Sequence, residues 1–183
     1  MNLKVWIVPF ISLFMLGCQQ HEEGEELLEG YELVEERPVV AETESGDYLL
    51  RVVSEKPIYD EDESVEVKAK LKYIGKGDKQ EIEYDQSPFT FYVQEVQRNE
   101  SLAYEEESTD SVGTLKHDRW FEEEYNLENV HVEESDDESF INAFSKKDRV
   151  PAGEYEVEVQ AVFSDREKGE DQRLSTGIIF SVQ

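Results

Sequence analysis

Apolar and polar residues alternate with a period of two in several short segments of the chain. The clearest segment spans 65–73, where Val, Ala, Leu and Tyr alternate with Glu and Lys, and residues 155–163 repeat the pattern. Such alternation is typical of strands with one face buried and the other in water. Shorter apolar or alternating segments predict further strands at 48–53, 82–84, 89–93 and 175–182.

Turn-forming residues separate these segments, and no segment has the pattern of a long helix. The turns lie at Gly75–Asp78, Pro151–Gly153 and within 164–173. About seven strands between residues 47 and 183 predict an all-β fold, an immunoglobulin-like antiparallel sandwich with Greek-key connections. Residues 97–112 are polar and weakly patterned, so we expect a loop there. Trp120 is a candidate to fill the core.

The N-terminal segment differs from the rest of the chain. Lys4 precedes an apolar run from Val5 to Leu16, which is too short to span a bilayer and has the length of a secretory signal. Residues 15–18, Met-Leu-Gly-Cys, resemble the lipobox of bacterial lipoproteins. The resemblance implies a signal peptide at 1–17, a lipid on Cys18, and a place on the extracytoplasmic face of a bacterial cell membrane. Because Cys18 is the one Cys of the chain, no intramolecular disulfide can form.

Residues 18–46 are predominantly acidic. They contain ten Glu, while Gly24, Gly30 and Pro38 interrupt any long helix. We interpret this stretch as a solvated tether with one short helix near 25–36. The competing interpretation is that residues 31–40 add an extra strand to the domain.

The charge balance narrows the class of partner. Lys and Arg number 18 against 45 Asp and Glu, for a net charge of −27, and without residues 1–17 the net charge is −28. Nucleic-acid binding through phosphate neutralisation is excluded, because that affinity comes from basic patches. A protein with several membrane spans is also excluded, since there is one long apolar run. An anionic membrane would repel this domain at short range.

Three segments resemble the immunoglobulin-like modules of bacterial lipoproteins. They are KPIYDEDESVEVKAKLKYIG (56–75), TLKHDRWFEEEYNL (114–127) and VPAGEYEVEVQAVF (150–163). Their order and spacing are also similar to the BsuPI-type proteinase-inhibitor domain of bacilli. The resemblance covers residues 47–183 and implies a small sandwich, but it transfers no inhibitory residue to this chain.

Catalytic and cofactor motifs are missing from the sequence. His21, His117 and His131 lie in the tether, a turn and an acidic segment, and no Ser stands in a G-x-S-x-G motif. Nucleophilic catalysis needs a nucleophile, a base and an orienting group. We therefore predict a protein that is not an enzyme and that needs no cofactor.

Two acidic turns are weak candidates for calcium binding, since Ca²⁺ prefers carboxylate and carbonyl oxygens. Their candidate ligands are Asp60, Asp62, Asp136 and Asp137. Neither turn has the EF-hand pattern or its Gly. Solvated turns are the favoured interpretation.

These observations favour a non-enzymatic, lipid-anchored binding module on the cell surface, with a basic protein or peptide as partner. The candidate contact regions are 99–112, 117–125 and 133–139. Within them the candidate interaction residues are His117, Arg119, Trp120 and Phe121. The alternatives are a proteinase-inhibitor-like protein and a calcium-stabilised structural module.

Overall fold

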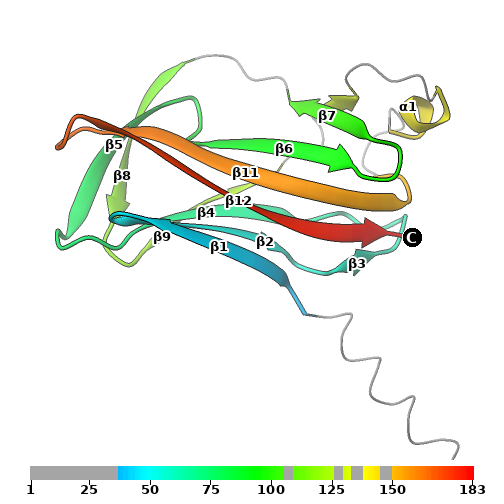
Figure 1. Ribbon diagram of the computed structural model, residues 1–183, viewed down its shortest axis with the longest axis horizontal. Helices are drawn as coiled ribbons and strands as arrows, with labels where there is room; N and C mark the ends of the chain where they lie inside the picture. Colours follow the sequence, from blue (N-terminus) through cyan, green and yellow to red (C-terminus); the bar gives the residue numbers. More distant parts are fainter. Residues whose placement is uncertain (1–36, 105–108, 126–129, 133–137, 145–149) are drawn as a thin grey trace, which may run out of the picture. The chain divides into compact units, whose positions relative to one another are not determined.

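The alternating segments form strands that pair into two β-sheets, and the sheets pack together around an apolar core (Figure 1). The computed structural model describes residues 37–104, 109–125, 130–132, 138–144 and 150–183. The predicted all-β sandwich is confirmed. In the described residues the strands number twelve rather than about seven. The excess comes mainly from short or edge strands with few core positions.

The smaller sheet, which we call sheet A, has four antiparallel strands. In spatial order they are β1 (Val39–Ser45), β2 (Tyr48–Ser54), β4 (Val67–Tyr73) and β9 (Trp120–Glu124). The alternation at 65–73 has the predicted effect, because Val67, Ala69 and Leu71 are buried while the lysines between them face outward.

The larger sheet, sheet B, is built around two long strands. In spatial order it contains β10 (Val130–Val132), β7 (Glu100–Tyr104), β6 (Phe89–Glu95), β11 (Gly153–Asp165), β12 (Glu170–Val182) and β3 (Ile58–Tyr59). The end of β11 also pairs with β5 (Lys79–Asp85), which pairs with β8 (Asp110–Lys116). One short helix, α1 (Glu138–Phe144), precedes β11. Pairing is antiparallel throughout, except that β3 is parallel to β12.

The core lies between the sheets and follows the period-two pattern. Every second residue of β11 from Tyr155 to Phe163 is buried, as predicted. Tyr155 stacks on Phe180 of β12, with ring centroids 5.5 Å apart. Burying each such side chain stabilises the fold by about 1.5–3 kcal/mol before entropy is subtracted. The core therefore depends mainly on β2, β4, β6, β11 and β12.

The predicted boundary between tether and domain, at residue 47, is wrong. Residues 39–45 form β1, which pairs with β2 along its whole length, from Val39 opposite Ser54 to Ser45 opposite Tyr48. Val39 and Ala41 pack against the core. The competing interpretation placed an extra strand at 31–40, which overlaps β1 only at its start. Residues 18–36 lie outside the described part.

The predicted loop at 97–112 is also wrong for half of its residues. Glu100–Tyr104 forms β7, and β8 begins at Asp110. Leu115 is the buried side chain of β8, and Leu102 is the buried one among the β7 side chains that the structure describes. A strand with one core residue leaves no alternation for sequence reasoning to detect.

A buried carboxylate joins the two sheets at one end of the sandwich. Asp165, at the end of β11, is fully buried. It accepts hydrogen bonds of 2.7 Å from the Tyr48 hydroxyl of β2 and 2.7 Å from the Gln80 side-chain amide of β5. The backbone amides of Glu167 and Lys168 donate to it at 3.0 Å. Polar groups in a low-dielectric interior need such partners.

These contacts predict a pH dependence of stability. Burial alone would raise the pKa of Asp165. The hydrogen bonds from the Lys168 amide, the Tyr48 hydroxyl and the Glu167 amide outweigh this effect, with help from the Lys168 charge, so the pKa of Asp165 lies below its ordinary value. A carboxyl whose pKa is lower in the folded state stabilises the fold above its unfolded pKa. That stability is lost as the pH falls through the folded pKa.

We therefore expect the free energy of unfolding to fall below about pH 4 more steeply in the wild type than in an Asp165→Asn variant. Urea unfolding at a series of pH values measures this difference. The other carboxyl groups titrate in both proteins, so they cancel in the comparison. Parallel pH profiles would show that Asp165 is not responsible.

Candidate interaction surfaces

The predicted interaction residues at 117–121 do not share one surface. His117 and Arg119 lie in the exposed turn between β8 and β9. The turn is closed by hydrogen bonds from the His117 amide to the Asp78 carbonyl, 2.9 Å, and from the Arg119 amide to the Lys116 carbonyl, 3.1 Å. Asp118 adopts a left-handed conformation, φ 55°, which Asp tolerates better than most residues.

Trp120 lies on the outer face of sheet A, so the suggestion that it fills the core is wrong. It is opposite Lys72 of β4 in the strand register. The Lys72 ammonium lies 4.2 Å and the Arg51 guanidinium 4.6 Å from its ring centroid. Cations over an indole face are attracted by the ring quadrupole. The position of Trp120 is thus explained by structural cation–π contacts.

Phe121 points the other way, because successive residues of a strand face opposite sides of the sheet. It packs against the core beside Phe89, with ring centroids 6.0 Å apart, and Tyr84, 6.3 Å away. Strand geometry therefore separates Trp120 from Phe121. The segment offers an exposed turn next to two side chains that already have partners.

Two of the four calcium candidates lie within the residues that the structure describes. Asp60 and Asp62 are exposed in the turn after β3. Their neighbour Glu63 is bound by the Lys56 ammonium at 2.6 Å. Among the described residues, no three His, Cys, Asp or Glu side chains are grouped so that they could hold a metal ion. Asp136, Asp137 and Cys18 lie outside the described residues.

The outer face of sheet A is basic at its centre, yet its cations are neutralised. Arg51 is paired with Glu42, and Lys68 lies 3.1 Å from Glu55. Lys70 lies 3.2 Å from Glu122, and Lys72 lies 3.7 Å from Asp118. These pairs bridge neighbouring strands or a strand and a turn. At a surface each pair contributes little to stability, but together they leave this face without an excess of free positive charge.

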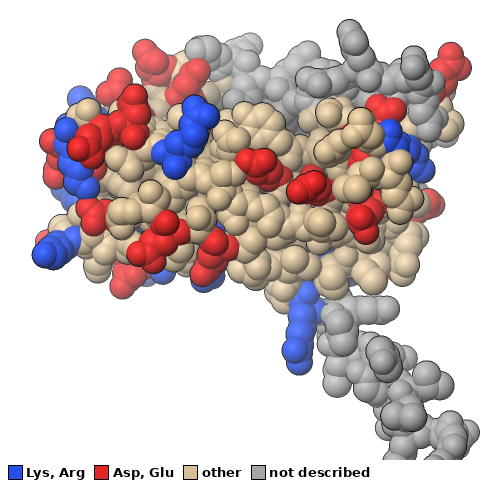
Figure 2. Space-filling view, viewed as in Figure 1, with Lys and Arg blue, Asp and Glu red and all other residues tan. Residues whose placement is uncertain are grey.

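The outer face of sheet B has the opposite character. Glu154, Glu156 and Glu158 project outward from β11 at every second position. Within the described part of the chain, none of the three has a Lys, Arg or His nitrogen within ion-pair distance. In Figure 2, separate acidic side chains stand on a largely uncharged surface over β11 and β12. The alternation at 155–163 predicts these residues only as the polar side of a strand.

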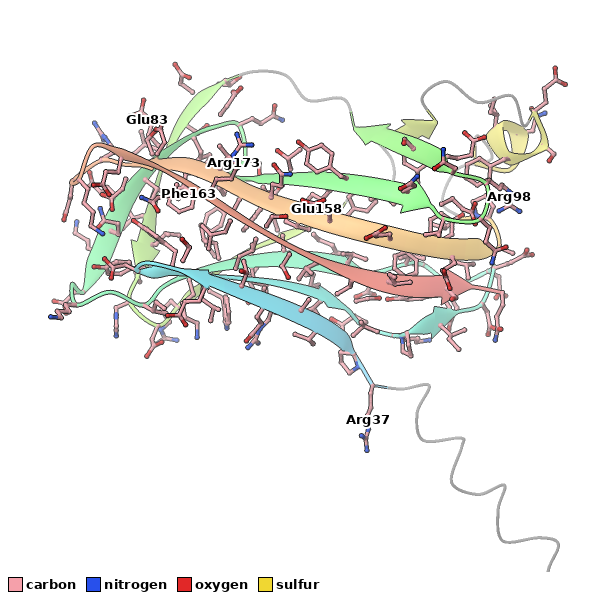
Figure 3. The ribbon with its side chains drawn as sticks, viewed as in Figure 1. Arg37, Glu83, Arg98, Glu158, Phe163 and Arg173 are labelled. Atoms are coloured by element: carbon pink, nitrogen blue, oxygen red, sulfur yellow. The ribbon has the colours of Figure 1, made fainter. Side chains whose placement is uncertain are left out.

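Hydrogen bonds hold one member of this row ionised. The Glu158 carboxylate accepts a hydrogen bond from the Ser175 hydroxyl of β12 and one of 3.1 Å from the Gln160 side-chain amide. Both bonds lower the pKa of Glu158 below its ordinary value, and the bond from Ser175 has the larger effect. Figure 3 shows Glu158 on β11 and Arg173 on the neighbouring strand β12. Glu158 is therefore held in its charged form at neutral pH.

No protein-family model matches this sequence, and a search of curated proteins finds no match. In the described residues, no helix is long and apolar enough to cross a membrane. The similarity to the BsuPI-type inhibitor domain stays a prediction. The charge and exposure of the two outer faces are thus the basis for a functional proposal.

Proposed function

We propose that this chain is a non-enzymatic binding module, anchored by lipid on Cys18 to the extracytoplasmic face of a bacterial cell membrane, and that its partner is a basic protein or peptide. The N-terminal pattern supports the anchor, because an apolar run typical of a signal precedes the chain's one Cys. The acidic charge of the remaining chain supports a domain that stands away from anionic lipid.

One observation carries the choice of partner, namely the unequal charge pairing of the two outer faces. The central cations of sheet A each have an acidic partner within 4.0 Å, whereas the Glu row of β11 has no cationic one among the described residues. Uncompensated negative charge on an exposed face attracts cationic partners and speeds their association. A basic protein would supply positive charges opposite this Glu row.

The proposal predicts that binding depends on salt. We expect partners recovered from intact cells by crosslinking to the full-length protein to be basic. We also expect their apparent affinity to fall roughly tenfold between about 0.05 and 0.5 M NaCl, because salt screens exposed charges. Binding of each recovered partner to the purified protein at several salt concentrations measures this.

A lipid-anchored protein with an unrelated acidic domain of similar net charge serves as the control for general attraction. Partners that bind both proteins equally are to be disregarded. Specific partners whose binding does not change with salt, or that are acidic, would contradict the proposed function.

A further inference from the structure

The outer face of sheet B combines the Glu row with exposed apolar side chains in a regular grid. In the strand register, Tyr92 of β6 is opposite Glu158, and Ile179 of β12 is opposite Glu156. Residues directly opposite in neighbouring strands have their Cβ atoms about 5 Å apart. Acidic and apolar side chains are therefore direct neighbours on this face.

The apolar members of the grid are accessible to solvent. Tyr92 is 52% exposed, Ile179 is 52% exposed and Val162 is 40% exposed. They are half of the large exposed hydrophobic side chains in the described residues, and all three lie on this one face. Apolar side chains gathered on one surface, rather than scattered singly, point to a binding surface.

The spacing of the acids indicates the conformation of the ligand. Residues on one face of a strand repeat about every 6.7 Å, twice the rise per residue. An extended peptide has the same repeat, so Lys or Arg at every second position can meet Glu154, Glu156 and Glu158 in turn. Gly177, opposite Glu158, has no side chain to cover that end of the row. The bonds from Ser175 and Gln160 hold the Glu158 carboxylate in place.

We propose that the outer face of β6, β11 and β12 binds an extended basic segment of the partner protein, with alternate Lys or Arg side chains on the Glu row. The aliphatic stems of these cations pack along Tyr92 and Ile179, as long basic side chains do on apolar surface. This inference rests on the proposed function and specifies its surface and ligand. Sheet A is the poorer surface for charged ligands of either sign, because its central cations are already paired.

The test uses the full-length protein in detergent and a defined probe, the fluorescent peptide Thr-Lys-Thr-Lys-Thr-Lys-Thr. Fluorescence anisotropy measures its affinity. The triple variant Glu154→Gln, Glu156→Gln, Glu158→Gln is expected to bind the peptide roughly tenfold more weakly than the wild type, since three charge pairs are lost.

A matched control removes the same charge elsewhere. Glu44, Glu124 and Glu170 are exposed, lie on other elements or at a strand end, and have no ion pair among the described residues. Their triple Gln variant is expected to change the affinity by less than about twofold. The uncharged substitution Ile179→Thr is expected to weaken binding by roughly threefold, because it removes apolar contact without changing charge. Circular dichroism establishes that each variant is folded.

A second peptide, with the three lysines contiguous, has the same composition and charge. We expect it to bind the wild type several-fold more weakly than the alternating peptide does. The difference corresponds to the loss of roughly one charge pair. Equal binding of the two peptides, or equal weakening by the two triple variants, would overturn the inference.

If cellular basic partners still bind in a salt-dependent manner in that case, the proposed function stands and only this surface is wrong. If no such partners exist, the proposed function itself is wrong.

Discussion

An Asp165→Ala variant is expected to lose about 3–5 kcal/mol of unfolding free energy, because the substitution removes the acceptor from a buried hydrogen-bond network. The Tyr48 hydroxyl and the Gln80 amide, each 2.7 Å from the Asp165 carboxylate, would be left without that partner. The turn after β11 would also lose the bonds from the Glu167 and Lys168 amides. Urea or thermal unfolding measures the loss.

Glu170→Ala is the matched control for this variant. Glu170 is opposite Asp165 in the β11–β12 register and is exposed, so the substitution removes the same charge from the same hairpin. We expect it to change the unfolding free energy by less than about 0.5 kcal/mol, as is usual at the surface. Similar losses in the two variants would mean that the buried network does not stabilise the sandwich as inferred.

The second large effect concerns the anchor. A Cys18→Ala variant is expected to incorporate no lipid, and the protein should be shed from the membrane or retained as precursor. Two or more acyl chains hold a protein stably at about 0.8 kcal/mol per buried CH₂, so their loss removes the anchor entirely. Metabolic labelling with a fatty-acid analogue and mass measurement of the product test this.

Gln19→Ala, a substitution of the next residue, serves as the control and is expected to leave labelling unchanged. If the Cys18→Ala variant still carried the label, the assignment of Cys18 would be wrong. If the wild type carried no label, the lipoprotein prediction as a whole would be wrong, although the binding surface on sheet B would not be affected.

Strands with several core positions could be predicted from the sequence, and those with one could not. β4 and β11 bury alternate residues along their length, so hydrophobic periodicity located both. β7 and the first three residues of β8 lie in the stretch predicted as a loop, and Leu102 and Leu115 are the buried side chains described in these two strands. β1 was assigned to the tether because its outward residues include Glu42 and Glu44. Its pairing with β2 uses backbone groups, which leave no mark in the sequence.

The candidate interaction residues also divide into features that the sequence could predict and features that it could not. Trp120 and Phe121 are neighbours in sequence and a plausible aromatic pair, but strand alternation sends one outward and the other inward. The Glu row of β11 was visible as alternation. Which strands flank β11 decides that the row has no cationic neighbour in the described part of the chain and that it lies beside Tyr92 and Ile179.

By itself, the sequence determined the all-β class, the core faces of the long strands, and the acidic net charge. These properties follow from composition and local periodicity, which each segment carries alone. The tertiary structure decided the extent of the domain, the burial of Asp165, and the difference between the paired cations of sheet A and the Glu row of sheet B, which has no cationic partner among the described residues. Each of these depends on contacts between residues far apart in the chain. Distance and desolvation, rather than residue type, decide whether such residues are paired or buried.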